Sequence, residues 1–178
     1  MGAISAPVGR GENMAEHINR RTALIMLGTG GLLLAAPGLF ADNRRTRPVI
    51  EKISKSEAQW RRILTPEQYR ILREEGTERP YSSPLNGEHR KGVYLCAGCD
   101  LELFSSEMKF DSGTGWPSFS AAIEGHVETK RDHRLLYPRT EYHCARCSGH
   151  QGHVFDDGPE PTGKRWCNNG LALKFMPE

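Results

Sequence analysis

Four of the five cysteines in this 178-residue chain are arranged as two C-x-x-C pairs. They are Cys96 with Cys99 and Cys144 with Cys147, separated by residues 100–143. Thiolates on two such pairs can converge on one tetrahedral zinc ion, with zinc–sulfur distances of about 2.3 Å. Because four thiolates fill the coordination sphere, we expect one structural Zn²⁺ per chain and no catalytic role for the metal. Such an ion would hold two distant segments together, which restricts the folds open to the chain.

Oxidation of the two pairs to disulfides is the alternative, particularly in an exported protein. A C-x-x-C disulfide closes a small, strained ring that is more often redox-active than structural. Two such rings in one chain would be unusual, so the pattern favours zinc. Cys167 is then the one cysteine without a structural role. Since Arg165 stands two residues before it and favours a thiolate, we expect Cys167 to be a nucleophile.

The first 41 residues predict an export signal. Arg20 and Arg21 precede an uncharged apolar run over residues 23–40, and the arginine pair resembles a twin-arginine signal. We therefore expect export, to the periplasm, with a retained membrane anchor as the alternative. Met14 offers a second start position at a signal-like distance from the arginine pair.

Residues 42–53 predict a polar linker, and residues 54–178 a single domain. With 37% hydrophobic and 26% charged residues, the composition is that of a soluble globular protein. The formal net charge of +2 is too small to predict a nucleic-acid partner. We expect a monomer.

Two short helices are predicted at the start of the domain. The first begins near Ser54, in a capping box, and runs to Leu64. The second has Thr65 as N-cap and Pro66 in its first turn, and it ends near Glu75. After residue 80 short apolar runs alternate with turn residues, which predicts a mainly β, antiparallel domain. The expected strands cover residues 92–96, 101–104, 125–129, 140–144, 153–155 and 171–175.

Several residues could be ordinary when each is considered alone. Trp116, in the glycine-rich loop over residues 113–119, would normally be a core residue. His150 and His153 could be sheet histidines or additional metal ligands, and Asn169 a turn residue. We interpret these residues as a site only because of the segments in which they occur and the order of those segments along the sequence.

That set resembles a known family. It comprises L-T-P-E-Q-Y-R-I-L-R-E-E-G-T-E-R-P, Y-L-C-A-G-C, D-S-G-T-G-W-P-S-F, C-A-R-C-S-G-H-Q-G-H-V-F-D-D-G and K-R-W-C-N-N. In this order the segments resemble the B-type peptide methionine sulfoxide reductases, which act on the R epimer, over residues 65–175. The resemblance implies two antiparallel β-sheets with short N-terminal helices. It also implies that oxidised methionine in peptides or proteins is the substrate, and that a thioredoxin-like or small thiol is the reductant.

The resemblance assigns the covalent step to Cys167. Its thiolate, favoured by Arg165, would attack the sulfoxide and become a sulfenic acid. Trp116 would supply the apolar surface for the substrate methyl group, and its placement relative to Cys167 would select one epimer.

The same resemblance implies which residues form the polar side of the site. His150 and His153 would polarise and protonate the sulfoxide oxygen. Asp157 and Asn169 would help to orient these polar groups.

The chain departs from the commonest family pattern at four positions. Thr114 stands where many members carry a recycling cysteine. Trp166 replaces a frequent tyrosine or phenylalanine, and Asn168 and Gly170 replace more usual small or aliphatic residues. Without a nearby second thiol, the sulfenic acid on Cys167 is expected to wait for an external thiol.

Two other functional classes remain open at this point. A non-catalytic zinc-ribbon binding module would explain the knuckles but leaves Cys167 and Trp116 without a role. A thiol-disulfide oxidoreductase would cycle its C-x-x-C pairs and would contain no metal. Metal analysis combined with thiol titration separates these alternatives.

Overall fold

The computed structural model describes residues 49–133 and 137–178. The predicted export signal and the linker residues before 49 lie outside the described residues. Among the helices of these two ranges, none has the length and apolar character needed to cross a bilayer.

Two short helices form as predicted, α1 (Glu57–Ile63) and α2 (Pro66–Glu74). Thr65 caps α2, because its hydroxyl accepts from the Gln68 N–H while its own N–H donates to the Gln68 side chain. The buried face of α2 consists of the three residues Tyr69, Ile71 and Leu72.

The first helix begins two residues later than predicted. Ser56, not Ser54, is its N-cap, and the capping box is completed by Gln59. Just before it, the Ile53 N–H donates to the carbonyl of Arg146 at 2.8 Å, so the chain is still extended along the domain there. The helix therefore starts only after the chain has left this contact.

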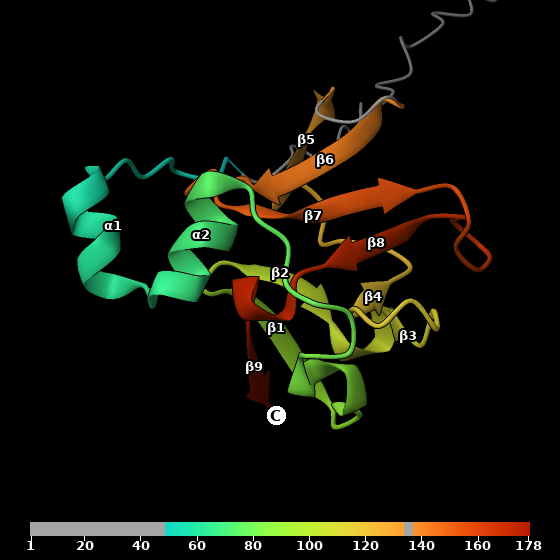
Figure 1. The fold of residues 1–178 in the computed structure, drawn as a ribbon. Helices are drawn as coiled ribbons and strands as arrows, with labels where there is room; N and C mark the ends of the chain where they lie inside the picture. The colour runs from blue at the N-terminus through green and yellow to red at the C-terminus, as the bar shows by residue number, and fades with distance from the viewer. Residues whose placement is uncertain (1–48, 134–136) are drawn as a thin grey trace, which may run out of the picture. The chain divides into compact units, whose positions relative to one another are not determined.

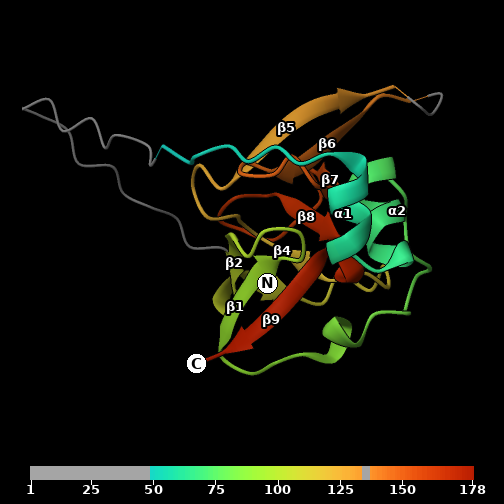
Figure 2. The same ribbon diagram turned by 90° about the vertical axis from the view of Figure 1, so that its left-hand side faces the viewer.

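The described strands form two antiparallel sheets, which confirms the predicted fold class (Figures 1 and 2). The smaller sheet has the order β2–β1–β9, and the larger one the order β3–β4–β8–β7–β6–β5. The strands are β1 (Gly92–Cys96), β2 (Glu102–Ser105), β3 (Lys109–Phe110), β4 (Ser118–Phe119), β5 (Val127–Asp132), β6 (Arg139–Cys144), β7 (His150–Phe155), β8 (Arg165–Asn168) and β9 (Leu173–Pro177). Short 3₁₀ helices are η1 (Pro84–Gly87), η2 (Ser106–Met108) and η3 (Gly170–Ala172).

The predicted strands are confirmed with end shifts of up to three residues, but β3, β4 and β8 were not predicted. The β8 sequence R-W-C-N has no alternating apolar pattern, and it is extended because it pairs with β7 and β4. Cys167 therefore lies in a central strand and not in a loop.

Aromatic rings fill the space between the sheets. Phe104 of β2 stacks on Phe119 of β4 with ring centroids 4.0 Å apart, and Tyr94 of β1 meets the edge of Phe119 at 4.9 Å. Tyr142 of β6 contacts Trp166 of β8 at 4.9 Å. Burying each such ring contributes roughly 1.5–3 kcal/mol, so this layer joins the two sheets.

The helices lie beside the cysteine pairs. In Figure 1 α2 lies against β7 and η3. Arg73 of α2 donates to the carbonyl of Cys147 at 2.9 Å, and its guanidinium lies 4.8 Å from the centre of the Trp60 ring. A Cβ added at Gly98 would lie 3.6 Å from Trp60, so α1 also packs on this region.

A bulge interrupts the pairing of β6 with β7. Tyr142 pairs with Gly152 and His143 with His150, so Gln151 has no partner in β6. Its side chain is fully buried. The extra residue thus places an amide in the interior beside β8.

Candidate active site and metal site

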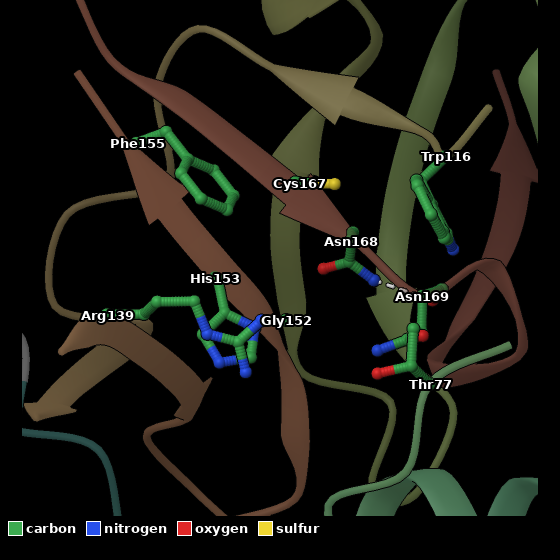
Figure 3. Close-up of a pocket in the computed structure, with 9 residues that line it drawn as sticks. All are labelled: Thr77, Trp116, Arg139, Gly152, His153, Phe155, Cys167, Asn168 and Asn169. Carbon is green, nitrogen blue, oxygen red and sulfur yellow. Dashed lines mark hydrogen bonds between the residues drawn. The ribbon is translucent and has the colours of Figure 1, made fainter. Parts of the chain in front are cut away.

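A cavity of about 120 Å³ opens beside Cys167 (Figure 3). With roughly 30 Å³ per water molecule, it has room for the end of one side chain. Its lining residues come from β6, β7, β8 and three connecting segments: Thr77, Trp116, Arg139, Gly152, His153, Phe155, Cys167, Asn168 and Asn169.

The thiol of Cys167 is half-buried at the centre of this cavity. Its strand pairs Cys167 with Ser118 on one side and with His153 on the other. Burial raises the pKa of the Cys167 thiol, whereas the Arg165 charge and hydrogen bonds from Thr114 and Arg165 oppose that rise. The thiolate is therefore stabilised by these two neighbours in a site that otherwise disfavours charge.

Arg165 is buried and held in a two-pronged ion pair. Its Nε and Nη2 both lie 2.8 Å from the carboxylate oxygens of Asp157, and its guanidinium lies 4.4 Å from the centre of the Phe155 ring. Neither Arg165 nor Asp157 lines the cavity. Asp157 thus orients Arg165, and it acts on the cavity only through that residue.

His153 faces the cavity within a charged group. Its Nε2 lies 2.8 Å from Oδ2 of Asp132, and the same oxygen accepts from Arg139 at 2.8 Å. Burial lowers the pKa of His153, while the hydrogen bond to Asp132 opposes this shift. Sequence reasoning missed Asp132 and Arg139, because only the pairing of β5 with β6 brings them together.

His150 lies next to His153 but away from the cavity. Its side chain is buried, its Nδ1 lies 2.9 Å from Oε1 of Glu141, and it does not line the cavity. The His150 and His153 rings are 5.6 Å apart between centroids. Among the described residues the buried Nε2 of His150 has no hydrogen-bond partner. The predicted histidine pair is therefore adjacent, but one member alone reaches the cavity.

Two aromatic rings flank the thiol. Figure 3 shows Cys167 between Trp116 and Phe155, with its sulfur directed toward the Trp116 side. The Trp116 indole donates to the carbonyl of Glu78 at 3.2 Å, which fixes the ring plane. Phe155 was not predicted, although it stands two residues after His153 in one strand and therefore shares its face.

Asn169 lines the cavity with an amide that is already bonded. Its Oδ1 accepts from the Glu78 N–H at 3.0 Å, and its Nδ2 donates to the Gln151 carbonyl at 2.9 Å. The carboxylate of Glu78 in turn accepts from the N–H groups of Gly170 and Leu171. Asn169 therefore fixes the end of β8, and its role in orienting the polar side of the site stays a prediction.

A glycine allows the two central strands to approach closely. A Cβ added at Gly152 would lie 1.9 Å from the carbonyl oxygen of Cys167. Any side chain there would force β8 away from β7. The H-x-G-H pattern thus combines a cavity histidine with a required glycine.

The four remaining cysteines form a metal-binding arrangement. Their sulfur atoms all lie within 4.8 Å of one another, with 3.6 Å between Cys96 and Cys147 and 3.5 Å between Cys99 and Cys144. Sulfurs bound tetrahedrally at about 2.3 Å from one ion would lie about 3.8 Å apart. The donor set therefore fits a metal ion, and all five cysteines of the chain are free thiols.

Comparisons with known proteins agree on one family. The model of the SelR domain matches residues 64–177. The chain is 55% identical over 135 residues to a peptide methionine sulfoxide reductase MsrB of Bradyrhizobium diazoefficiens, covering 75% of this chain and 97% of that one. An MsrB of Agrobacterium fabrum is 54% identical over 127 residues, covering 71% and 94%. The chloroplastic peptide methionine sulfoxide reductase B1 of Arabidopsis thaliana is 51% identical over 135 residues, covering 75% and 67%.

Proposed function

The chain belongs to the SelR-domain family of B-type peptide methionine sulfoxide reductases, and from this premise we propose how its own residues carry out the reduction. It is a peptide-methionine (R)-S-oxide reductase. The observation that carries the proposal is the half-buried Cys167 thiol in a small cavity, between two aromatic rings and opposite His153.

The reaction moves one oxygen atom and two electrons. The Cys167 thiolate supplies an electron pair, the S–O bond of the substrate breaks, and the oxygen is retained on Cys167 as a sulfenic acid. The substrate leaves as the thioether. The proton taken up by the oxygen comes from His153. Burial lowers the pKa of His153, and the hydrogen bond to Asp132 favours its protonated form against that shift.

The residues that line the cavity determine which sulfoxide epimer can react. The methyl group packs on Trp116, while the oxygen is directed toward His153 and Arg139 across the cavity. Only one configuration at sulfur can satisfy both contacts while its sulfur faces Cys167. We therefore assign the selection of the R epimer to the opposed placement of these groups.

Regeneration requires an external thiol. The other four cysteines are gathered in the metal site, and the side chain next to Cys167 at the recycling position is Thr114. A thioredoxin-like dithiol or a small thiol would attack the sulfenic sulfur, release water and then resolve the mixed disulfide.

The metal is assigned as structural zinc. Cys96, Cys99, Cys144 and Cys147 would hold it, and four thiolates leave no position for water. When bound, zinc supplies a cross-link between distant segments and no acid or nucleophile. The bond-breaking and proton-transfer steps are then assigned to Cys167 and His153.

One turnover tests the proposal. The zinc-loaded protein is mixed with one equivalent of N-acetylated methionine (R)-sulfoxide and a sulfenate-specific reagent, and the adduct should appear on the peptide that contains Cys167. The S epimer should remain unreacted, and Cys167→Ser should form no adduct. A disulfide between Cys167 and another cysteine, accompanied by zinc release, would overturn the external-thiol route. Equal consumption of both epimers would overturn the assignment of the cavity walls.

A further inference from the structure

A line of buried polar side chains connects the cysteine cluster with the nucleophile strand. The Tyr142 hydroxyl donates to Oδ1 of Asn168 at 2.6 Å, and Nδ2 of Asn168 donates to Oε1 of Gln151 at 3.5 Å. Nε2 of Gln151 then donates to the sulfur of Cys96 at 3.4 Å. Each of the three polar residues has an exposed fraction of 0%.

The main chain strengthens the longest step of this line. The Asn169 N–H and its side-chain amide both donate to the Gln151 carbonyl at 2.9 Å, and Nδ2 of Asn168 donates to the Asn169 carbonyl at 2.7 Å. Gln151 and the end of β8 are thus tied by backbone and side-chain contacts. Asn168 directly follows Cys167, so a shift of this unit would displace the thiol.

Packing alone does not require amides and a hydroxyl at these positions. A buried polar group without a partner costs about 1–3 kcal/mol. Tyr142, Asn168 and Gln151 avoid this cost because each hydrogen-bonds to the next residue of the line. The bulge at Gln151 directs its side chain toward Cys96, where its N–H can donate to a metal-bound thiolate.

We propose that Tyr142, Asn168 and Gln151 form a positioning relay that couples metal retention at Cys96 with the placement of Cys167. The proposal rests on the assignment of Cys167 as nucleophile and of the cysteine cluster as the zinc site. It predicts reciprocal effects: a change beside Cys167 loosens the metal, and a change beside Cys96 alters the nucleophile.

Zinc release gives the first test, on the full zinc-loaded chain with a chromophoric chelator. The hydrogen bonds of the Asn168 side chain go to Tyr142, Gln151 and Asn169 and not to a metal cysteine. Asn168→Leu should nevertheless accelerate zinc release by about three- to tenfold, the loss expected for a hydrogen bond or two. Gln151→Met should act similarly. The double variant should release zinc no faster than the faster single variant, because both changes break the same connection.

Alkylation of Cys167 gives the reciprocal test. Gln151→Met should change the rate of reaction of Cys167 with iodoacetamide, followed by mass analysis, by about three- to tenfold. Tyr94→Phe is the matched control, because it removes another buried phenol that donates to the carbonyl of Glu88 outside the relay. It should leave both rates unchanged.

Each outcome decides the proposal. Unchanged zinc release in Asn168→Leu, or additive effects in the double variant, would overturn the coupling. If Asn168→Leu does not fold, Tyr142→Phe removes the hydroxyl and keeps the ring, and it should still accelerate zinc release while Tyr94→Phe does not. Neither readout requires turnover, so failure of the relay is distinguishable from failure of the proposed reaction, which wild-type turnover tests.

Discussion

At the scale of single residues, the reactivity of Cys167 depends on its pKa, which burial raises and the buried Arg165 cation lowers. Burial disfavours the thiolate, and Arg165 favours it from two residues away on the same strand. Because the thiolate is the attacking form, the rate of alkylation of Cys167 should rise with pH through the raised pKa of Cys167. Below that pKa the thiol is protonated and most of the attacking form is lost.

Replacing Arg165 should raise the pKa of Cys167 further. We expect Arg165→Met to move the pH midpoint of Cys167 alkylation upward. The rate at neutral pH should fall about tenfold for every pH unit by which the midpoint rises, because the thiolate fraction falls by that factor. Lys164→Met is the control, because Lys164 is an adjacent cation paired with the exposed Asp156. An unmoved midpoint in Arg165→Met would show that the guanidinium does not stabilise the thiolate.

Thr114 lies beside Cys167, in the glycine-rich loop over residues 113–119. Its hydroxyl hydrogen-bonds to Cys167, so a thiol placed there should lie within reach of a sulfenic acid. Thr114→Cys is expected to form a disulfide with Cys167 after one turnover, seen by mass analysis, with zinc retained. Thr114→Ser should form none. Absence of the disulfide in Thr114→Cys would mean that the loop holds this side chain away from Cys167 after oxidation.

At the scale of elements, the site depends on the close pairing of β7 with β8. That pairing places His153 opposite Cys167 and depends on Gly152, whose missing side chain admits the carbonyl of Cys167. The Gln151 bulge and the Asn169 bonds then hold the end of β8. The position of the strand that carries Cys167 is therefore set mainly by its neighbours.

A methyl group at this contact should damage both stability and activity. We expect Gly152→Ala to lower the free energy of unfolding by about 1–3 kcal/mol or more, because overpacking forces the strands apart. Gly87→Ala is the matched control, since an added Cβ there meets nothing within 4 Å. Denaturant unfolding and turnover measure the effect. Equal stability of both variants would mean that β8 can move without penalty.

At the scale of the whole domain, the cluster of four cysteines joins the loop after β1 to the loop after β6. These loops belong to different sheets, and α1 and α2 pack over them. Without an ion, four crowded thiols must share the site and the connection is lost. Metal binding should therefore contribute directly to folding.

Removing one ligand should lower metal content and thermal stability together. We expect Cys99→Ser to lose zinc, measured by elemental analysis, and to unfold at a markedly lower temperature. Cys167→Ser is the control, because it removes a half-buried thiol outside the cluster and should retain both properties. A Cys99→Ser protein with full stability and no metal would show that the ion does not hold the fold.

The sequence by itself was sufficient for features that depend on short spacing. The cap at Thr65 and the gathering of the four paired cysteines at one place were predicted correctly, because a capping box and a C-x-x-C knuckle are defined by residues three apart. The R-W-C-N-N segment likewise indicated Cys167 as the candidate nucleophile. Family membership followed from the order of such segments.

Tertiary structure decided the walls of the site. Asp132 and Arg139 come together through the β5–β6 pairing, Phe155 flanks the thiol because β7 lies beside β8, and His150 is withdrawn behind His153. The hydrogen bond from Gln151 to Cys96 depends on a β-bulge, and no local sequence pattern predicts that bulge. Strand register and bulges depend on contacts between distant segments, and a one-residue shift in pairing changes which side chains share a face. For that physical reason the sequence determined the chemical groups, and only the folded sheet decided how they face one another.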